Sequence, residues 1–249
     1  MDVRDERVSR AEDRTSPGPR ISLLGAFGLS DGRVDVAIAE GPQRLLAFLA
    51  LRKRPVRRTI AAAALWPDVT PEHAASSLRS TLARLDEGAR SALVVTAAQL
   101  AIADRVTVDL WESEALAGRL AGPHESLTLD HSSSAEVDAL SSDILPDWYE
   151  DWVIVEAEAW RLQRLHALEA LADDLRSEGS LGQASAAAQR AVDADPLRES
   201  PRAALIRVHM AEGNVSDAIR EFAQYRALLK RELGLEPTPR LQALLDQGP

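Results

Sequence analysis

Cysteine is absent from this chain of 249 residues, and so are long apolar runs. Without cysteine there is no disulfide framework and no thiolate metal ligand, which excludes disulfide-rich secreted proteins and cysteine-based zinc sites. No stretch reaches the roughly 18 apolar residues of a membrane span, and the first twenty residues lack the apolar core of a signal peptide. We therefore expect a cytoplasmic protein with no membrane partner.

Motifs of catalysis are also missing. The five histidines lack metal-ligand spacing, and neither the nucleophile motif G-x-S-x-G nor the nucleotide-binding motif G-x-x-x-x-G-K-[ST] occurs. Acidic residues do alternate with three tryptophans over 147–160, but this pattern is more typical of a solvated helix face beside a packed aromatic face. The sequence predicts a protein that is not an enzyme and uses no metal and no cofactor.

Basic residues are in the minority and unevenly distributed. The formal net charge is -10, and Lys53 and Lys230 are the only lysines among the 29 basic residues. Residues 21–111 contain 11 basic and 9 acidic side chains, whereas residues 112–249 contain 13 and 25. Such asymmetry favours a first domain that faces DNA, joined to an acidic domain that does not.

The order of the expected elements is that of a winged helix-turn-helix. Residues 1–19 are interpreted as a disordered tail that ends in a Pro/Gly-rich segment. Apolar residues alternate at period two within 21–39, three helical patterns follow, and period two then returns. The expected elements are short strands in 21–39, helices over 41–54, 59–66 and 71–87, and hairpin strands over 93–95 and 100–108. We place the winged-helix domain at 20–111.

The remainder, 112–249, is predicted to be an all-α domain of tetratricopeptide-like repeats. A shift of 34 residues superimposes Gly179 on Gly213 and Ala184 on Ala218, and Ala218 and Phe222 match the repeat motif A-x3-F. An unrelated helical bundle is the alternative. The overall fold class is therefore mainly α, with an α+β N-terminal part.

The third helix of the first domain is expected to read DNA. When Leu78 faces the core, the opposite face carries small, polar and basic side chains, which suit the major groove. Two arginines at the start of the second helix suit phosphate contacts. The predicted DNA contacts are Arg57, Arg58, Thr59, His73, Ser76, Ser77, Arg79, Ser80, Arg84 and Arg105.

Two features oppose this interpretation, and a solvated polar helix face is the simpler alternative. Glu87 is expected to lie along the same face, where its charge would repel phosphate. The hairpin tip has no basic residue, and Arg105 on the expected second strand is the one basic residue available there.

Several blocks of the chain, covering about 21–247, resemble the SARP family of actinobacterial transcription activators. These activators join an OmpR-type winged helix to a bacterial transcriptional activator domain. The more specific blocks lie in the C-terminal part. The matching blocks are 43–50, 65–67, 77–85, 108–111, 145–153, 164–171, 196–200 and 232–239.

The resemblance implies a sequence-specific regulator that binds promoter DNA, usually as a homodimer, and recruits RNA polymerase. It assigns the recognition helix to 74–87, with Arg79 and Arg84 as the principal contacts. The missing nucleotide-binding motif makes this a short form without an ATPase module. A protein with this role is expected in the cytoplasm, associated with the nucleoid.

Two other functions remain open at this point. The acidic helical domain and the neutral hairpin tip also fit a protein-interaction adaptor whose winged helix has lost DNA binding. A ligand sensor that holds a small molecule between repeats is a third possibility, although no polar constellation in the sequence points to one.

Overall fold

The computed structural model describes residues 18–32, 34–122 and 133–246. Most of the tail predicted at 1–19 therefore lies outside the described residues, and its last residue, Pro19, accepts a hydrogen bond from Thr107 N at 3.0 Å. The chain divides into two compact units. Unit 1 comprises 1–112 and 143–157, and unit 2 comprises 113–142 and 158–249. The predicted domain boundary lies at 111/112, whereas unit 1 also includes 143–157.

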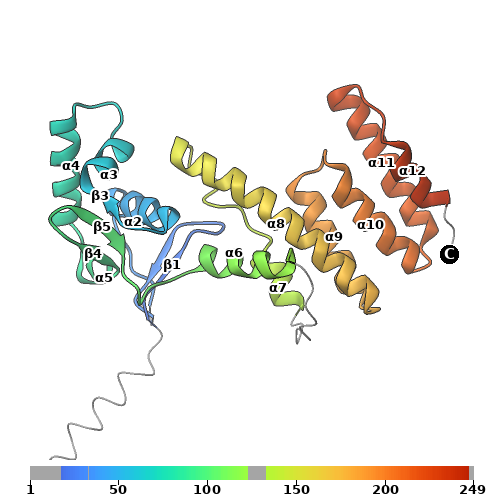
Figure 1. Cartoon of the computed structure of the whole chain (residues 1–249), viewed down its shortest axis with the longest axis horizontal. Helices are drawn as coiled ribbons and strands as arrows, with labels where there is room; N and C mark the ends of the chain where they lie inside the picture. The colour runs from blue at the N-terminus through green and yellow to red at the C-terminus, as the bar shows by residue number, and fades with distance from the viewer. Residues whose placement is uncertain (1–17, 33, 123–132, 247–249) are drawn as a thin grey trace, which may run out of the picture. The chain divides into compact units, whose positions relative to one another are not determined.

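Two small sheets flank the helices of unit 1 (Figure 1). In the first, β1 (Arg20–Ser22) pairs antiparallel with β2 (Gly28–Ser30) and parallel with β6 (Thr107–Val108). Asp109 fastens this sheet to the helix that follows, because its carboxylate accepts hydrogen bonds from Leu23 N at 2.8 Å and Leu24 N at 3.2 Å.

The core of unit 1 is built around α2 (Glu40–Arg52), in which every residue from Leu45 to Leu51 is buried. The strands β3 (Val56–Arg57), β5 (Gln99–Ile102) and β4 (Leu93–Val95) form the second sheet in that order. The predicted second hairpin strand, 100–108, is wrong in extent. A turn at 104–105 divides it, and its last residues, in β6, pair with β1 in the other sheet.

Unit 1 contains the predicted helix-turn-helix. Helix α3 (Arg58–Leu65) packs against α4 (Pro71–Ala83), and the short α5 (Glu87–Ser91) follows. The predicted helix over 71–87 is thus too long. Asp86 starts a new helix by accepting a 2.7 Å hydrogen bond from Ala89 N, and Arg90 donates at 3.0 Å to the carbonyl of Leu82 near the end of α4. Buried Leu85 continues the apolar pattern through the break, which explains why the periodicity did not reveal it.

The first turns of α8 (Asp151–Ser177) belong to unit 1. Trp152 is buried there and meets the ring of Phe48 edge to face, with 5.4 Å between the centroids. Of the acidic residues expected to form a solvated face, Asp147, Asp151 and Glu158 are exposed, whereas two others form partly buried ion pairs. Glu150 accepts from Arg44 at 2.9 Å, and Glu156 accepts from Arg52 at 3.4 Å.

Unit 2 is entirely helical in its described part. Its helices are α6 (Asp109–Leu120, whose first residues lie in unit 1), α7 (Ser133–Ala139), the rest of α8, α9 (Leu181–Ala194), α10 (Glu199–Ala211), α11 (Val215–Leu233) and α12 (Pro239–Asp246). Helix α10 packs against α9, α11 and α12. Alanines at 184, 187, 188 and 191 are fully buried on α9, so their small side chains permit close approach of the helices.

The 34-residue repeat is visible in the backbone hydrogen bonds. Ser180 N donates to Leu175 O at 2.8 Å, and 34 residues later Asn214 N donates to His209 O at 2.9 Å. Gly179 and Gly213 precede these donors with φ of 81° and 75°, a left-handed conformation that ends a helix and favours glycine. The predicted fold class, a winged helix followed by a tetratricopeptide-like helical domain, is confirmed.

Candidate nucleic-acid interface

Helix α4 buries one face and exposes a polar, basic one. Ala74, Leu78, Thr81 and Leu82 are its buried residues. The predicted contacts of this helix lie on the remaining surface, and all but the half-buried Ser77 are exposed. These are His73, Ser76, Ser77, Arg79, Ser80 and, at the C-terminal cap, Arg84. The exposed face therefore has the small side chains and arginine donors that a major groove accommodates.

The N-terminus of α4 is held by its sequence. Thr70 is the cap residue and accepts from His73 N at 3.4 Å, and Pro71 occupies the first turn, where its missing N–H costs nothing. The ring Nδ1 of His73 lies 3.0 Å from Thr70 Oγ1. His73 is thus part of the cap as well as an exposed side chain at the end of the helix.

Glu87 lies on a different helix from the exposed face of α4, contrary to the prediction that it lies along that face. Helix α4 ends at Ala83, so Arg84 is its cap and Glu87 is the first residue of α5. The helical surface of α4 therefore does not continue to Glu87. The segment 74–87, which the resemblance assigns to the recognition helix, is thus not one helix: α4 ends at Ala83 and α5 begins at Glu87.

Arg57 and Arg58 lie beside the tip of the hairpin formed by β4 and β5. Arg57 pairs with Gln99 in the sheet. The backbone N of Arg58 donates to Ala98 O at 3.0 Å, and its Nη1 donates to Thr96 O at 3.3 Å. The tip has no basic residue of its own, but these two arginines and the exposed Thr59 bring positive charge and the start of α3 next to it.

Arg105 lies at the other end of the hairpin. It occupies the turn after β5, not the second hairpin strand as predicted, and its Nη2 donates at 2.8 Å to the carbonyl of Ser91, which precedes β4. The structure brings Arg57, Arg58 and the hairpin tip together, and leaves Arg105 apart from them.

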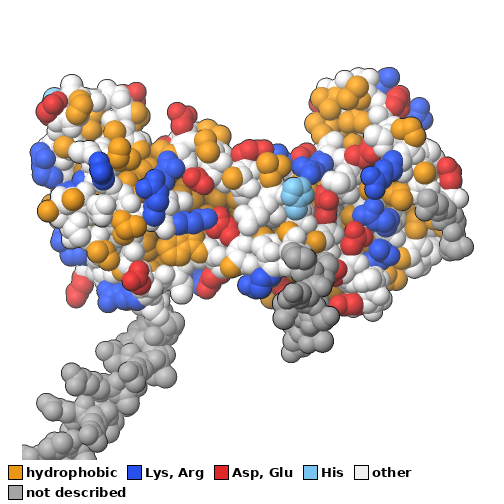
Figure 2. All heavy atoms as spheres, in the orientation of Figure 1, with side chains coloured by type: hydrophobic (Ala, Val, Ile, Leu, Met, Phe, Trp, Pro, Cys, Tyr) orange, Lys and Arg blue, Asp and Glu red, His pale blue; other side chains and the backbone are white. Residues whose placement is uncertain are grey.

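Other arginines of unit 1 differ in availability. Arg44 and Arg52 are engaged by Glu150 and Glu156. Arg54 is exposed after α2, and its signal in the sequence is the basic run that precedes the proline at 55. On the face of unit 1 that Figure 2 shows, the basic side chains are scattered among polar and apolar ones.

Asp109, which joins the sheet of β1 and β6 to α6, has a perturbed pKa. Burial raises the pKa of Asp109, although hydrogen bonds from the backbone of Leu23, Leu24 and Leu110 and the charge of Arg20 act in the opposite direction. Asp109 thus has a positioning role between β1 and α6 and lies partly out of solvent. Over the described ranges no helix is long and apolar enough to cross a membrane, and no group of three or more acidic or histidine side chains could hold a metal ion.

Comparison with known proteins supports the same architecture. The chain is 28% identical to the regulatory protein AfsR of Streptomyces coelicolor, over 94% of this chain and 24% of AfsR, so it spans about a quarter of that relative. The solved structure of Mycobacterium tuberculosis EmbR in complex with a low-affinity phosphopeptide superimposes with a TM-score of 0.69. That match has 24% identity and covers 93% of this chain and 66% of EmbR, and it shows the fold alone.

A family model described as the bacterial transcriptional activator domain matches residues 80–247. The match extends over most of the chain, from the last turn of α4 to the end of α12. It confirms the resemblance drawn from the sequence blocks, to transcription regulators and not to enzymes. The chain belongs to the bacterial transcriptional activator domain family.

Proposed function

We propose that this protein is a sequence-specific DNA-binding transcription regulator that reads promoter DNA with α4. The single observation that carries the proposal is the exposed face of α4, on which Arg79 and the cap residue Arg84 accompany serines on a capped, well-packed helix. Arginine hydrogen-bonds bidentately to guanine, and serine reaches bases or phosphates. Arg79 and Arg84 are assigned to base contacts, with His73, Ser76, Ser77 and Ser80 around them.

The phosphate contacts are assigned to the region around the hairpin tip. Arg57, Arg58 and Thr59 stand at the N-terminus of α3, where the helix dipole and the two basic side chains favour an anion. Because Arg58 is bonded to Thr96 O, a phosphate bound there would also touch the tip. Arg105 remains a candidate for a separate backbone contact at the base of the hairpin.

Activation, partners and location are part of the same proposal, and family membership supports them. The regulator binds promoter DNA as a homodimer, recruits RNA polymerase and activates transcription in the cytoplasm, associated with the nucleoid. Repeated or symmetric half-sites would match a dimer, since operator symmetry reflects protein symmetry.

The decisive experiment is retention of genomic fragments by the purified chain near physiological salt, followed by titration of a retained fragment at several salt concentrations. The wild type should retain a few promoter fragments, with an affinity that falls steeply with salt because phosphate contacts release counterions. An Arg79→Ala/Arg84→Ala double variant should no longer retain these promoter fragments preferentially, since each bidentate base contact contributes about 1–3 kcal/mol of discrimination.

A matched control removes the same charge elsewhere. Arg190 and Arg220 are exposed on helices of unit 2, so an Arg190→Ala/Arg220→Ala variant has the same net charge as the first double variant. It should retain the same fragments as the wild type. Equal retention by all three proteins would refute the assignment of α4, and retention by none would refute DNA binding.

An adaptor that binds a partner protein is the second candidate. The observation in its favour is apolar surface on unit 2, where Ile219, Leu233 and Leu235 are more than half exposed. Stacked helical repeats use such surfaces for protein partners. Recovery of a defined stoichiometric partner by a protein that retains no DNA would favour this function.

A further inference from the structure

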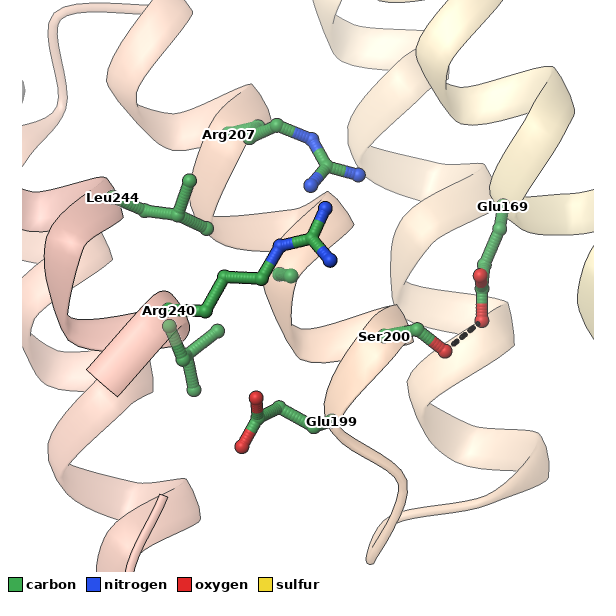
Figure 3. A pocket seen from close by; sticks show the side chains of 8 residues that line it. Glu169, Glu199, Ser200, Arg207, Arg240 and Leu244 are labelled. Atoms are coloured by element: carbon green, nitrogen blue, oxygen red, sulfur yellow. Dashed lines mark hydrogen bonds between the residues drawn. The ribbon is translucent and has the colours of Figure 1, made fainter. Parts of the chain in front are cut away.

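Unit 2 contains a cavity of about 410 Å³ between the helices of its repeat stack (Figure 3). Its lining comes from three separated parts of the sequence: α8, α10 and α12. The lining residues are Glu169, Glu199, Ser200, Ala203, Arg207, Arg240, Leu241 and Leu244. The volume falls within the range of about 300–1,000 Å³ that is typical of small-molecule sites.

Two arginines direct their guanidinium groups toward one another at this cavity (Figure 3). Two nitrogens of Arg207 donate hydrogen bonds to the carboxylate of Asp173: Nη2 to Oδ2 at 3.2 Å and Nε to Oδ1 at 3.4 Å. Arg240 forms no hydrogen bond or ion pair within 18–32, 34–122 and 133–246. Like charges that face one another repel, and an anion between them would convert the repulsion into two attractions.

The two acidic residues of the lining accept hydrogen bonds from neighbouring residues of unit 2. Glu169 accepts a 2.7 Å hydrogen bond from the hydroxyl of Ser200. Glu199 accepts from the backbone N of Thr238 at 2.9 Å and from its hydroxyl group, and so holds the start of α12. These carboxylates therefore have local partners, whereas the donors of Arg240 have none in the part of the chain that the structure describes.

The rest of the lining is apolar. Leu241 is 1% exposed and belongs to the core cluster of α10, α11 and α12, and Ala203 and Leu244 pack against that cluster. An apolar wall beside two arginines fits a ligand with an oxyanion at one end and a hydrocarbon portion at the other.

We propose that this cavity binds a small amphipathic anion, whose carboxylate or phosphate head lies between Arg207 and Arg240 and whose apolar part packs on Ala203, Leu241 and Leu244. The site adds ligand binding to the proposed function and does not depend on it, because its residues lie in unit 2 and the proposed DNA contacts lie in unit 1. A failure of DNA binding would leave this proposal intact, and the reverse also holds.

The test is calorimetric titration of the full chain with two probes of the same chain length, octanoate and octyl phosphate, at constant ionic strength. We expect saturable binding of one molecule of at least one probe per chain, with amide shifts in ¹H–¹⁵N spectra at Ser200, Ala203 and Leu244. The more tightly bound probe identifies the head group. Inorganic phosphate and 1-octanol, which each lack one half of the ligand, should bind at least tenfold more weakly.

Two variants assign the binding to the cavity. Arg240→Gln should weaken the better probe at least tenfold while leaving the fold intact, because Arg240 is exposed and has no partner among the described residues. Arg190→Gln, on the exposed surface of α9, should leave the affinity unchanged. Absence of saturable binding by both probes, or equal affinity of the wild type and Arg240→Gln, would overturn the proposal. Inorganic phosphate that binds as tightly as the octyl probes would also overturn it, because the apolar wall would then contribute nothing.

Discussion

Arg44 Nε lies 2.9 Å from Glu150 Oε1, across 106 residues of sequence, with about a quarter of each side chain exposed. The same guanidinium donates from Nη2 to Leu65 O at 3.1 Å, at the end of α3. Arg44 therefore joins α2, α3 and the segment 143–157 within unit 1. Burial of Trp152 against Phe48 is the larger reason why that segment packs with residues so distant in sequence, and the ion pair adds a specific polar contact to it.

The first prediction concerns this pair. Replacement of Glu150 by Gln should lower the free energy of unfolding by about 1 kcal/mol, more than an exposed pair contributes, because water screens the contact only partly. Arg44→Met should lower the free energy of unfolding further than Glu150→Gln does, since Leu65 O also loses its hydrogen-bond donor. Urea unfolding of both single variants and the double variant gives the coupling energy. Asp147→Asn, an exposed change on the same segment, is the control, and a zero coupling energy would contradict the role assigned to the pair.

The second prediction compares Arg58 and Arg105, which are both predicted from the sequence to contact DNA. Arg58→Ala should weaken DNA binding about tenfold and lower the salt dependence by about one ion, because it removes a proposed phosphate contact and the bond to Thr96 O. Arg105→Ala should have the smaller effect, since Arg105 lies at the base of the hairpin on Ser91 O. Fluorescence anisotropy with one retained fragment measures both, and a larger loss for Arg105→Ala would reverse the assignment.

The third prediction tests the repeat turns. An added Cβ meets nothing within 4 Å at Gly213 or at Gly182, so the two positions differ in backbone conformation and not in space. Gly213 has a φ of 75°, where alanine costs about 1–2 kcal/mol, whereas Gly182 lies in α9, where alanine gains about 0.5–1 kcal/mol. Gly213→Ala should thus lower the melting temperature and Gly182→Ala should raise it. Shifts of the same sign would show that the left-handed turn does not limit stability.

The fourth prediction concerns pH. Because burial raises the pKa of Asp109 above its ordinary 3.8, the folded state binds its proton more tightly than the unfolded state. The stabilising contribution of the protonated Asp109 is therefore complete below pH 3.8. It is lost as the pH rises through the folded pKa, because the partly buried carboxyl must then ionise.

Urea unfolding across this pH range, compared with Asp109→Asn, measures the effect. The stability of the wild type relative to the variant should fall as the pH rises. A relative stability that rises with pH would mean that the three backbone hydrogen bonds outweigh burial and that the pKa is lowered.

Several features of this protein follow from local sequence. The 34-residue repeat, with glycines at 179 and 213, predicts the helical domain because a left-handed turn recurs at a fixed spacing. The order of strands, three helices and a hairpin predicts the winged helix, and Thr70 with Pro71 predicts the start of α4 because capping depends on neighbouring residues.

Tertiary structure alone decided the rest. The end of α4 was hidden because Leu85 remains buried through the break, so the apolar period continues while Asp86 begins another helix. The pairing of Arg44 with Glu150 and the meeting of Arg207 with Arg240 join residues far apart in the chain. Long-range contacts of this kind depend on how helices pack, and no local pattern of residues records them.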